Sequence, residues 1–95
     1  MTTPGSERVE MIRVALQLRF SPLELVVTDE SHLHAGHAGA RSGRGHFRVR
    51  VVAEAFKGML LIHRHRAVYD ALGGLMQSDI HALAIEARAP GEAGA

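Results

Sequence analysis

The chain of 95 residues contains no cysteine. It therefore forms no disulfide, and on its own it cannot hold an iron–sulfur cluster or a zinc ion through thiolates. Aromatic residues make up only 4% of the chain, so aliphatic side chains must fill most of the core. A chain of this length is expected to form one domain over residues 1–95, with flexible tails over 1–5 and 90–95.

Long apolar runs are also absent. The longest, Met59–Ile62, is far shorter than the roughly 20 residues of a membrane-spanning helix. The N-terminal segment "MTTPGSERVE" lacks the basic start and apolar stretch of a signal peptide. We therefore expect a soluble, cytoplasmic protein that does not associate with membranes.

The charge is nearly balanced, with a formal net charge of +1. Basic residues nevertheless cluster between Arg41 and Arg66. Nucleic-acid binding requires a basic face, and a small total charge neither shows nor excludes one.

Hydrophobic periodicity predicts elements in the order α-β-β-α-β. The predicted helices and strands cover about Glu7–Arg19, Leu23–Asp29, His46–Val52, Met59–Met76 and Ile80–Arg88. The first two strands are expected to form an antiparallel hairpin. The last strand is expected to join the second in parallel, through a right-handed crossover. The fold class is therefore α/β (α+β), a three-stranded mixed sheet with both helices on one face.

Two of these elements carry clear facial patterns. The strand His46–Val52 alternates, with Phe47, Val49 and Val51 on the face expected to be buried. The opposite face carries His46, Arg48 and Arg50. In the second helix, an apolar stripe is expected to face the sheet, with Gly73–Gly74 weakening or ending the helix locally. The stripe consists of Leu61, His65, Val68, Leu72 and Leu75 or Met76.

The segment between the first two strands is rich in histidine. "SHLHAGHAGARSGRGHF", from Ser31 to Phe47, holds four of the seven histidines of the chain. His32, His34 and His37 are candidate ligands for zinc or iron, and the alternative is that they are solvated loop residues. His81 begins a strand, where a rigid backbone holds it, and the alternative there is a packed edge histidine bonded to main chain.

No catalytic arrangement stands out, and we expect the protein not to be an enzyme. "GARSGRG" lacks the Lys-Ser/Thr ending of a phosphate-binding loop. The basic residues are candidate phosphate contacts for DNA, namely Lys57, Arg64, Arg66, Arg48 and Arg50. No aromatic residue alternates with them, so base stacking has little support, and a solvated helix face is the alternative.

Taken together, the segments "VVTDESHLHAGHAG", "GHFRVRVVAEAFKG", "RHRAVYDAL" and "IHALAI" resemble the BolA family. The resemblance covers about Val9 to Ala89. It implies the same α-β-β-α-β order, similar to a class II KH fold. The GxxG loop of nucleic-acid-binding KH modules is not visible where the second helix begins.

The resemblance implies two functions. The first is partnership with a monothiol CGFS-type glutaredoxin, in a heterodimer that shares a [2Fe-2S] cluster. The partner and its glutathione would supply sulfur ligands, and the family's positions fall on His81 and His34, with His32 and His37 as alternates. The free chain would be monomeric, without a cofactor. The second function is transcriptional regulation in stress and morphology, with DNA bound through the region of the second helix.

Overall fold

The computed structural model describes residues 5–34 and 43–95, apart from the side chains of 33 and 34. Helices and strands follow the predicted order, with short 3-10 turns (η) and one short helix between them. The elements are α1 (Gly5–Phe20), β1 (Glu24–Asp29), η1 (Ser31–His34), β2 (Gly45–Val52), η2 (Glu54–Phe56), α3 (Leu61–Leu72), α4 (Leu75–Ser78) and β3 (Ile80–Arg88).

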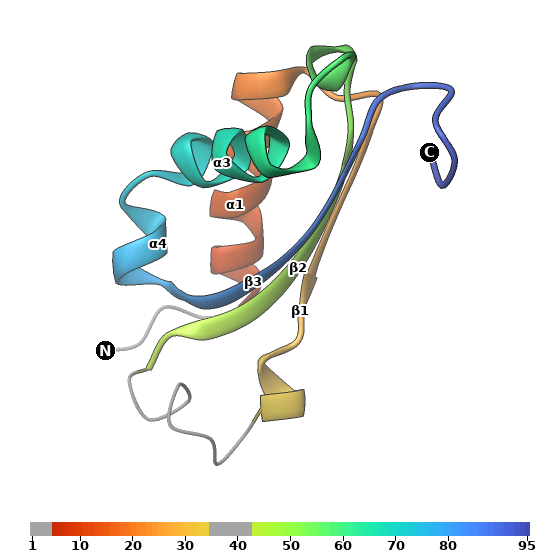
Figure 1. Ribbon diagram of the computed structural model, residues 1–95. Coiled ribbons are helices and arrows are strands. Elements are labelled where there is room, and N and C mark those ends of the chain that lie inside the picture. The colour runs from red at the N-terminus through yellow and green to blue at the C-terminus, as the bar shows by residue number, and fades with distance from the viewer. Residues whose placement is uncertain (1–4, 35–42) are drawn as a thin grey trace.

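The three strands form one mixed sheet in the order β1-β2-β3. β2 pairs with β1 in antiparallel and with β3 in parallel orientation, as predicted. α1, α3 and α4 lie on the same face of this sheet, and the other face is left open by the helices (Figure 1). The predicted fold class is therefore confirmed, while the similarity to a class II KH fold stays a prediction.

The core forms between the sheet and the helices. Phe47, Val49 and Val51 of β2 are buried, as their alternation predicted. The helices and η2 supply the other half of the core with Ile12, Leu16, Phe20, Phe56, Val68 and Leu72. Burying each large apolar side chain contributes about 1.5–3 kcal/mol, so this contact adds to the strand pairing that holds β2.

The second predicted helix is divided in two by glycine. α3 ends at Leu72, and Gly73 follows with a φ of 52°, a conformation that favours glycine. The Gly73 N–H donates to the Tyr69 carbonyl at 3.0 Å, which caps the helix. α4 then begins at Leu75, so the glycine pair ends the helix, which is the stronger of the two predicted effects.

α3 is rotated relative to the predicted stripe. Val68 and Leu72 are buried as expected, but Leu61 is 58% exposed and Arg64 is only 5% exposed. The buried Arg64 guanidinium donates to two main-chain carbonyls. Nε donates to the Met59 carbonyl at 2.9 Å, and Nη1 donates to the Ala87 carbonyl at 3.1 Å. An arginine can replace an apolar residue here because its charge is paired and its donors are used.

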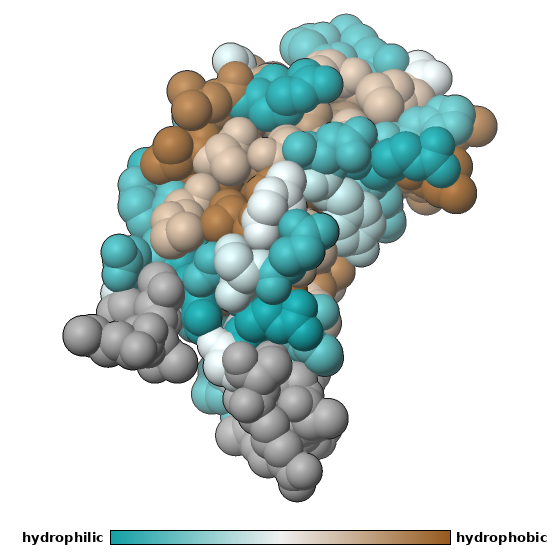
Figure 2. Space-filling view, turned by 90° about the vertical axis from the view of Figure 1, so that its left-hand side faces the viewer, coloured by the Kyte–Doolittle hydropathy of each residue, from teal (hydrophilic) through white to brown (hydrophobic). Residues whose placement is uncertain are grey.

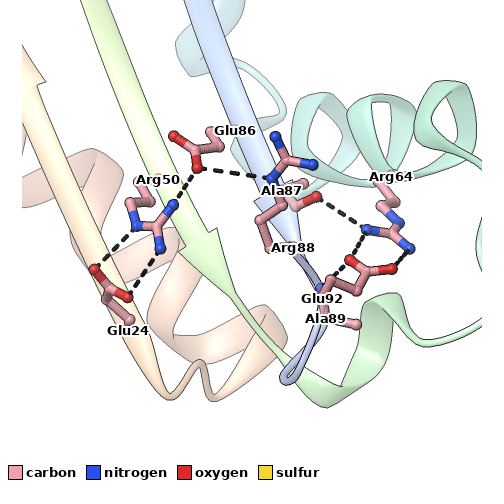
Figure 3. A network of polar contacts seen from close by, with 8 residues as sticks. All are labelled: Glu24, Arg50, Arg64, Glu86, Ala87, Arg88, Ala89 and Glu92. Carbon is pink, nitrogen blue, oxygen red and sulfur yellow. Dashed lines mark hydrogen bonds and ion pairs between the residues drawn. The ribbon is translucent and has the colours of Figure 1, made fainter. Parts of the chain in front are cut away.

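Glu92 provides that pairing. Its carboxylate accepts from both terminal nitrogens of Arg64, at 2.6 and 2.8 Å, and from the Ala89 N–H at 2.7 Å (Figure 3). These bonds lower the pKa of Glu92 to about 2, the bond from Arg64 being the largest cause. Glu92 is thus anchored to α3. The expected flexible tail over 90–95 stays a prediction.

The Arg64–Glu92 pair also covers the outer edge of β3. The Arg88 carbonyl accepts from the Ala53 N–H, next to the C-terminal end of β2, so Arg88 turns its main chain toward β2. The main-chain N–H and C=O groups of neighbouring residues in a strand face opposite sides. The Ala87 carbonyl and the Ala89 N–H therefore lie on the free edge. Arg64 and Glu92 satisfy both groups and so protect this part of the edge from pairing with another chain.

Hydrophobic residues also gather on the outside of the helices. Figure 2 shows the helix-covered side, where they form brown patches between hydrophilic areas. Exposed members include Val14 and Leu18 on α1 and Leu60, Leu61 and Ile62 at the start of α3. α1 therefore carries apolar side chains on two sides, one facing the core and one facing outward.

We expect the stability of the protein to decrease as the pH falls from about 4.5 toward 2, in part because of Glu92. The folded-state pKa of this group lies near 2, below its ordinary value of 4.5, so its contribution is present above 4.5 and lost as the pH falls through 2. Glu92→Gln should lower the free energy of unfolding at pH 7 and remove this part of the pH dependence. Urea unfolding at several pH values measures both effects.

Glu54→Gln is the matched control for this experiment. Glu54 pairs with Lys57 at 3.0 Å, but both side chains are about two-thirds exposed, so solvent screens the pair. We expect its unfolding curve to match the wild type. Equal losses in Glu92→Gln and Glu54→Gln would show that Arg64–Glu92 is an ordinary surface pair.

Candidate functional site

His81 stands out because a register shift separates it from the regular sheet. Gly45 pairs with Ile80 and His46 pairs with Ala82, so His81 is the extra residue at the start of β3. Such bulges redirect side chains at the ends of strands. The His81 side chain is exposed, and its ring centroid lies 5.2 Å from that of His46.

His46 is the buried neighbour of this exposed histidine. It belongs to the face of β2 that the helices leave open, yet it is only 8% exposed. An open hollow of about 280 Å³ lies beside it, lined partly by Arg48, Ala82 and Ala84. The small side chains of the two alanines leave this part of the open face unfilled beside His46.

η1 is fixed to the same end of the sheet. The Asp29 carboxylate accepts from the Ser31 N–H at 2.8 Å, which turns the chain out of β1. The Ser31 hydroxyl then accepts from the His46 N–H at 3.1 Å, and the Glu30 N–H donates to the His46 carbonyl at 2.8 Å. The histidine-rich segment therefore starts directly beside His46.

The predicted ligands can now be placed. His81 and His32 are both exposed, on β3 and η1. His34 is the last residue of η1, with its side chain outside the description, and His37 lies outside the described residues. Because β1 and β3 flank β2, the chain enters η1 and β3 at the same end of the sheet, on opposite sides of β2.

The described residues do not make a metal site by themselves. Among the described side chains, which do not include that of His34, no group of three or more histidine or acidic side chains is arranged to hold a metal ion. An exposed imidazole on a rigid sheet instead fits a single donor to a metal group whose other ligands come from elsewhere. This agrees with the lack of cysteine in the chain.

Most of the predicted phosphate contacts face carboxylates. Arg50 lies between Glu24 and Glu86 on the open face of the sheet and pairs with both (Figure 3). Arg48 pairs with Glu30 at 3.1 Å, again on that face. The hydrogen bond to Glu24 is the main cause that raises the pKa of the Arg50 guanidinium. The arginines of β2 thus belong to a mixed-charge surface rather than a basic one.

The arginine and lysine residues around α3 differ from one another. Arg64 is buried and its donors are used, so its predicted role as a DNA contact is wrong. Lys57 is exposed and pairs with Glu54, and Arg66 is exposed on α3. The basic surface left at this helix consists of Lys57 and Arg66, and their role stays a prediction.

Comparison with known proteins identifies the family. A family model described as "BolA-like protein" matches residues 16–92. The chain belongs to the BolA-like family. It is similar to SufE-like protein 1, chloroplastic/mitochondrial, of Arabidopsis thaliana, with 44% identity over 86 residues. It is also similar to the protein BOLA1, chloroplastic, of the same plant, with 41% identity over 88 residues.

The aligned residues make up most of this BolA-like chain but a smaller share of each relative. They include 85% and 90% of this chain, but only 23% of the first relative and 55% of the second. The DNA-binding transcriptional regulator BolA of Escherichia coli (strain K12) is 38% identical over 76 residues, which are 80% of this chain and 70% of that protein.

Solved structures of the family have the same fold. The BolA domain of SufE1 from Arabidopsis thaliana matches with a TM-score of 0.80 and 43% identity, over 93% of this chain and 96% of that one. The solution structure of BolA1 from Mus musculus matches with a TM-score of 0.74 and 38% identity, over 95% and 69% of the two chains.

The comparisons also bear on location. The two plant relatives carry chloroplastic or mitochondrial names, so the cytoplasmic location expected for this BolA-like chain stays a prediction. None of the described helices is long and apolar enough to cross a membrane.

The role of His46 in this site was missed from the sequence. It was assigned only to the polar face of its strand, yet it lies beside His81. A signal was available, because "GHF" and "IHA" place a histidine at the start of each of two strands that were expected to pair in parallel. Parallel strands bring their amino ends to the same edge of a sheet.

Gly45 allows η1 to lie close to β2 because it has no side chain. We expect Gly45→Ala to disturb the whole site. A Cβ at this position would lie 2.6 Å from the Phe47 ring and 2.8 Å from the Ser31 hydroxyl. Overpacking of this kind costs about 1–3 kcal/mol. Thermal unfolding and the amide NMR signals of His46 and His81 measure the loss of stability and the disturbance.

Gly74→Ala is the control, since nothing lies within 4 Å of a Cβ added there. Its φ and ψ of −60° and −20° also suit alanine, so we expect stability to be unchanged or slightly raised. If Gly45→Ala behaved like Gly74→Ala, the close contact between η1 and β2 would be refuted.

Proposed function

We propose that this BolA-like chain is an adaptor that binds a monothiol glutaredoxin and shares a [2Fe-2S] cluster with it. Its role would be in iron–sulfur trafficking or in iron and redox regulation, without catalysis by the chain itself. The observation that supports this proposal is the exposed His81, held on a bulge beside His46 where the histidine-rich segment begins. Family membership supports it independently.

The composition of the chain defines what the partner must supply. Because the chain has no cysteine, every thiolate on the cluster would come from the glutaredoxin and its glutathione. His81 would be the ligand fixed by the sheet. His34 would be the second ligand, with His32 and His37 as alternates. Replacing thiolates by histidines on one iron lowers the negative charge around the cluster and raises its reduction potential.

Mixing the chain with a cluster-loaded monothiol glutaredoxin should produce a new visible absorption and circular dichroism spectrum. His81→Ala should abolish or strongly alter that spectrum, because it removes the ligand held by the sheet. Separate His32→Ala, His34→Ala and His37→Ala variants would identify the second ligand as the one whose loss changes the spectrum.

His63→Ala is the matched control, since His63 is an exposed histidine on α3 and not part of the site. Its spectrum should equal that of the wild type. An unchanged spectrum in His81→Ala would contradict the proposed ligand, and no new spectrum with the wild type would contradict the shared cluster.

A second candidate function is DNA-binding regulation. The Escherichia coli relative that is 38% identical carries the name DNA-binding transcriptional regulator, which supports this second function. With Arg64 buried, the candidate contacts are Lys57 and Arg66, with Arg48 and Arg50 already paired to carboxylates. This surface is small, so we rank the function second.

If the chain binds DNA, replacing Lys57 and Arg66 together by alanine should weaken binding and flatten its salt dependence. Losing two phosphate contacts lowers the slope of log K against log salt by about 2. Filter binding at several salt concentrations measures this slope, with Arg13→Ala on α1 as the control for a lost surface charge. Retention of DNA without salt dependence in the wild type would count against this function.

A further inference from the structure

Arg44 lies against the proposed cluster ligand. Its Nη2 is 3.3 Å from His81 Nδ1, and its Nη1 donates to the Gln77 carbonyl at 3.5 Å. Arg44 directly precedes β2, whereas Gln77 belongs to α4 and His81 to β3. The guanidinium therefore connects the start of β2 with the chain that leads into β3.

The chemistry of this contact determines which nitrogen of His81 is available. A guanidinium only donates hydrogen bonds, so Nδ1 of His81 must be the acceptor. In a neutral imidazole the proton then lies on Nε2. A metal binds the nitrogen without a proton, and here that nitrogen is the one facing Arg44. Metal binding at His81 must therefore displace Arg44, or move the proton to Nδ1 and break the same contact.

The charge of Arg44 acts differently on two kinds of metal group. The guanidinium stays positive at all physiological pH values, and it lies 3.3 Å from the His81 ring, so an ion that approaches this ring meets its charge. A free divalent cation is repelled at this distance. A [2Fe-2S] cluster carries a net negative charge while four thiolates hold it, so the same guanidinium attracts it on delivery. Once two imidazoles replace two thiolates the oxidised cluster is neutral, and the guanidinium does not repel it as it repels a free cation.

We propose that Arg44 is a specificity-determining residue, which disfavours free divalent cations at His81 and favours an anionic cluster delivered by a partner. The contact between Arg44 Nη2 and His81 Nδ1 carries this inference. For its biological ligand the inference rests on the proposed cluster-sharing function. Its effect on free metal ions belongs to the chain alone.

The first test uses Zn²⁺ as the probe and the full chain without a partner. Arg44→Ala should bind Zn²⁺ at His81 about tenfold more tightly than the wild type at low ionic strength, and added salt should reduce the difference. Arg44→Lys should restore weak binding because it keeps the charge. The readout is the ¹⁵N shift of the His81 imidazole, which separates His81 from zinc bound by other histidines.

Two controls separate this contact from general charge effects. Arg66→Ala removes the same charge from an exposed position on α3 and should leave the affinity of His81 for Zn²⁺ unchanged. In a protein that already carries His81→Ala, adding Arg44→Ala should not change total zinc binding. Arg44 is proposed to affect zinc only through His81, so the two effects are not additive.

The second test is the ring tautomer of His81 in the metal-free protein, at a pH where the ring is neutral. The wild type should carry the proton on Nε2, and Arg44→Ala should show a mixture of tautomers. Equal zinc affinity of His81 in wild type and Arg44→Ala, or a wild-type proton on Nδ1, would overturn the proposal.

These outcomes are distinct from failure of the cluster-sharing function. Tighter zinc binding in Arg44→Ala, combined with no new spectrum when the wild type is mixed with a cluster-loaded glutaredoxin, would refute cluster sharing but keep the effect of Arg44 on free cations. With both roles correct, Arg44→Ala should also take up the cluster from the loaded glutaredoxin more slowly than the wild type does.

Discussion

The pairing of β2 with a strand on each side is the constraint on which the rest of the structure depends. One face of β2 forms the core with the helices, and its amino end joins η1 to the start of β3. The register shift opposite Gly45 and His46 adds His81 at this end as an exposed side chain. The central strand β2 therefore positions both the hydrophobic core and the candidate site.

Much of the fold was predictable because its signals are local. The alternation of Phe47, Val49 and Val51 identified the buried face of β2, and the glycine pair identified the break after α3. The burial of Arg64 was not predictable, since it depends on Glu92, 28 positions further along the chain. Periodicity describes which face of a helix is apolar, but a distant carboxylate can bring a charged residue into that face.

The candidate site was predictable in its members more than in its arrangement. The sequence suggested His81 and the histidine-rich segment, but the contacts of His46 and Arg44 with His81 depend on a bulge that no periodicity reports. Two features of the chain support the proposed sharing of a cluster with a partner. The Arg44 guanidinium only donates hydrogen bonds, and the chain has no cysteine. The chain would offer imidazole to a cluster whose thiolates belong to a partner, and would discourage free cations from taking its place.

The central claim is that His81 binds iron directly in the shared cluster. Electron–nuclear double resonance on the reduced complex tests it, with ¹⁵N-histidine incorporated into this chain only and an unlabelled monothiol glutaredoxin as partner. The account predicts two strongly coupled ¹⁵N signals. His81→Ala should remove one of them, or the whole cluster, and His63→Ala should leave both. Absence of any coupled nitrogen from the labelled chain, or a signal that His81→Ala leaves unchanged, would contradict it.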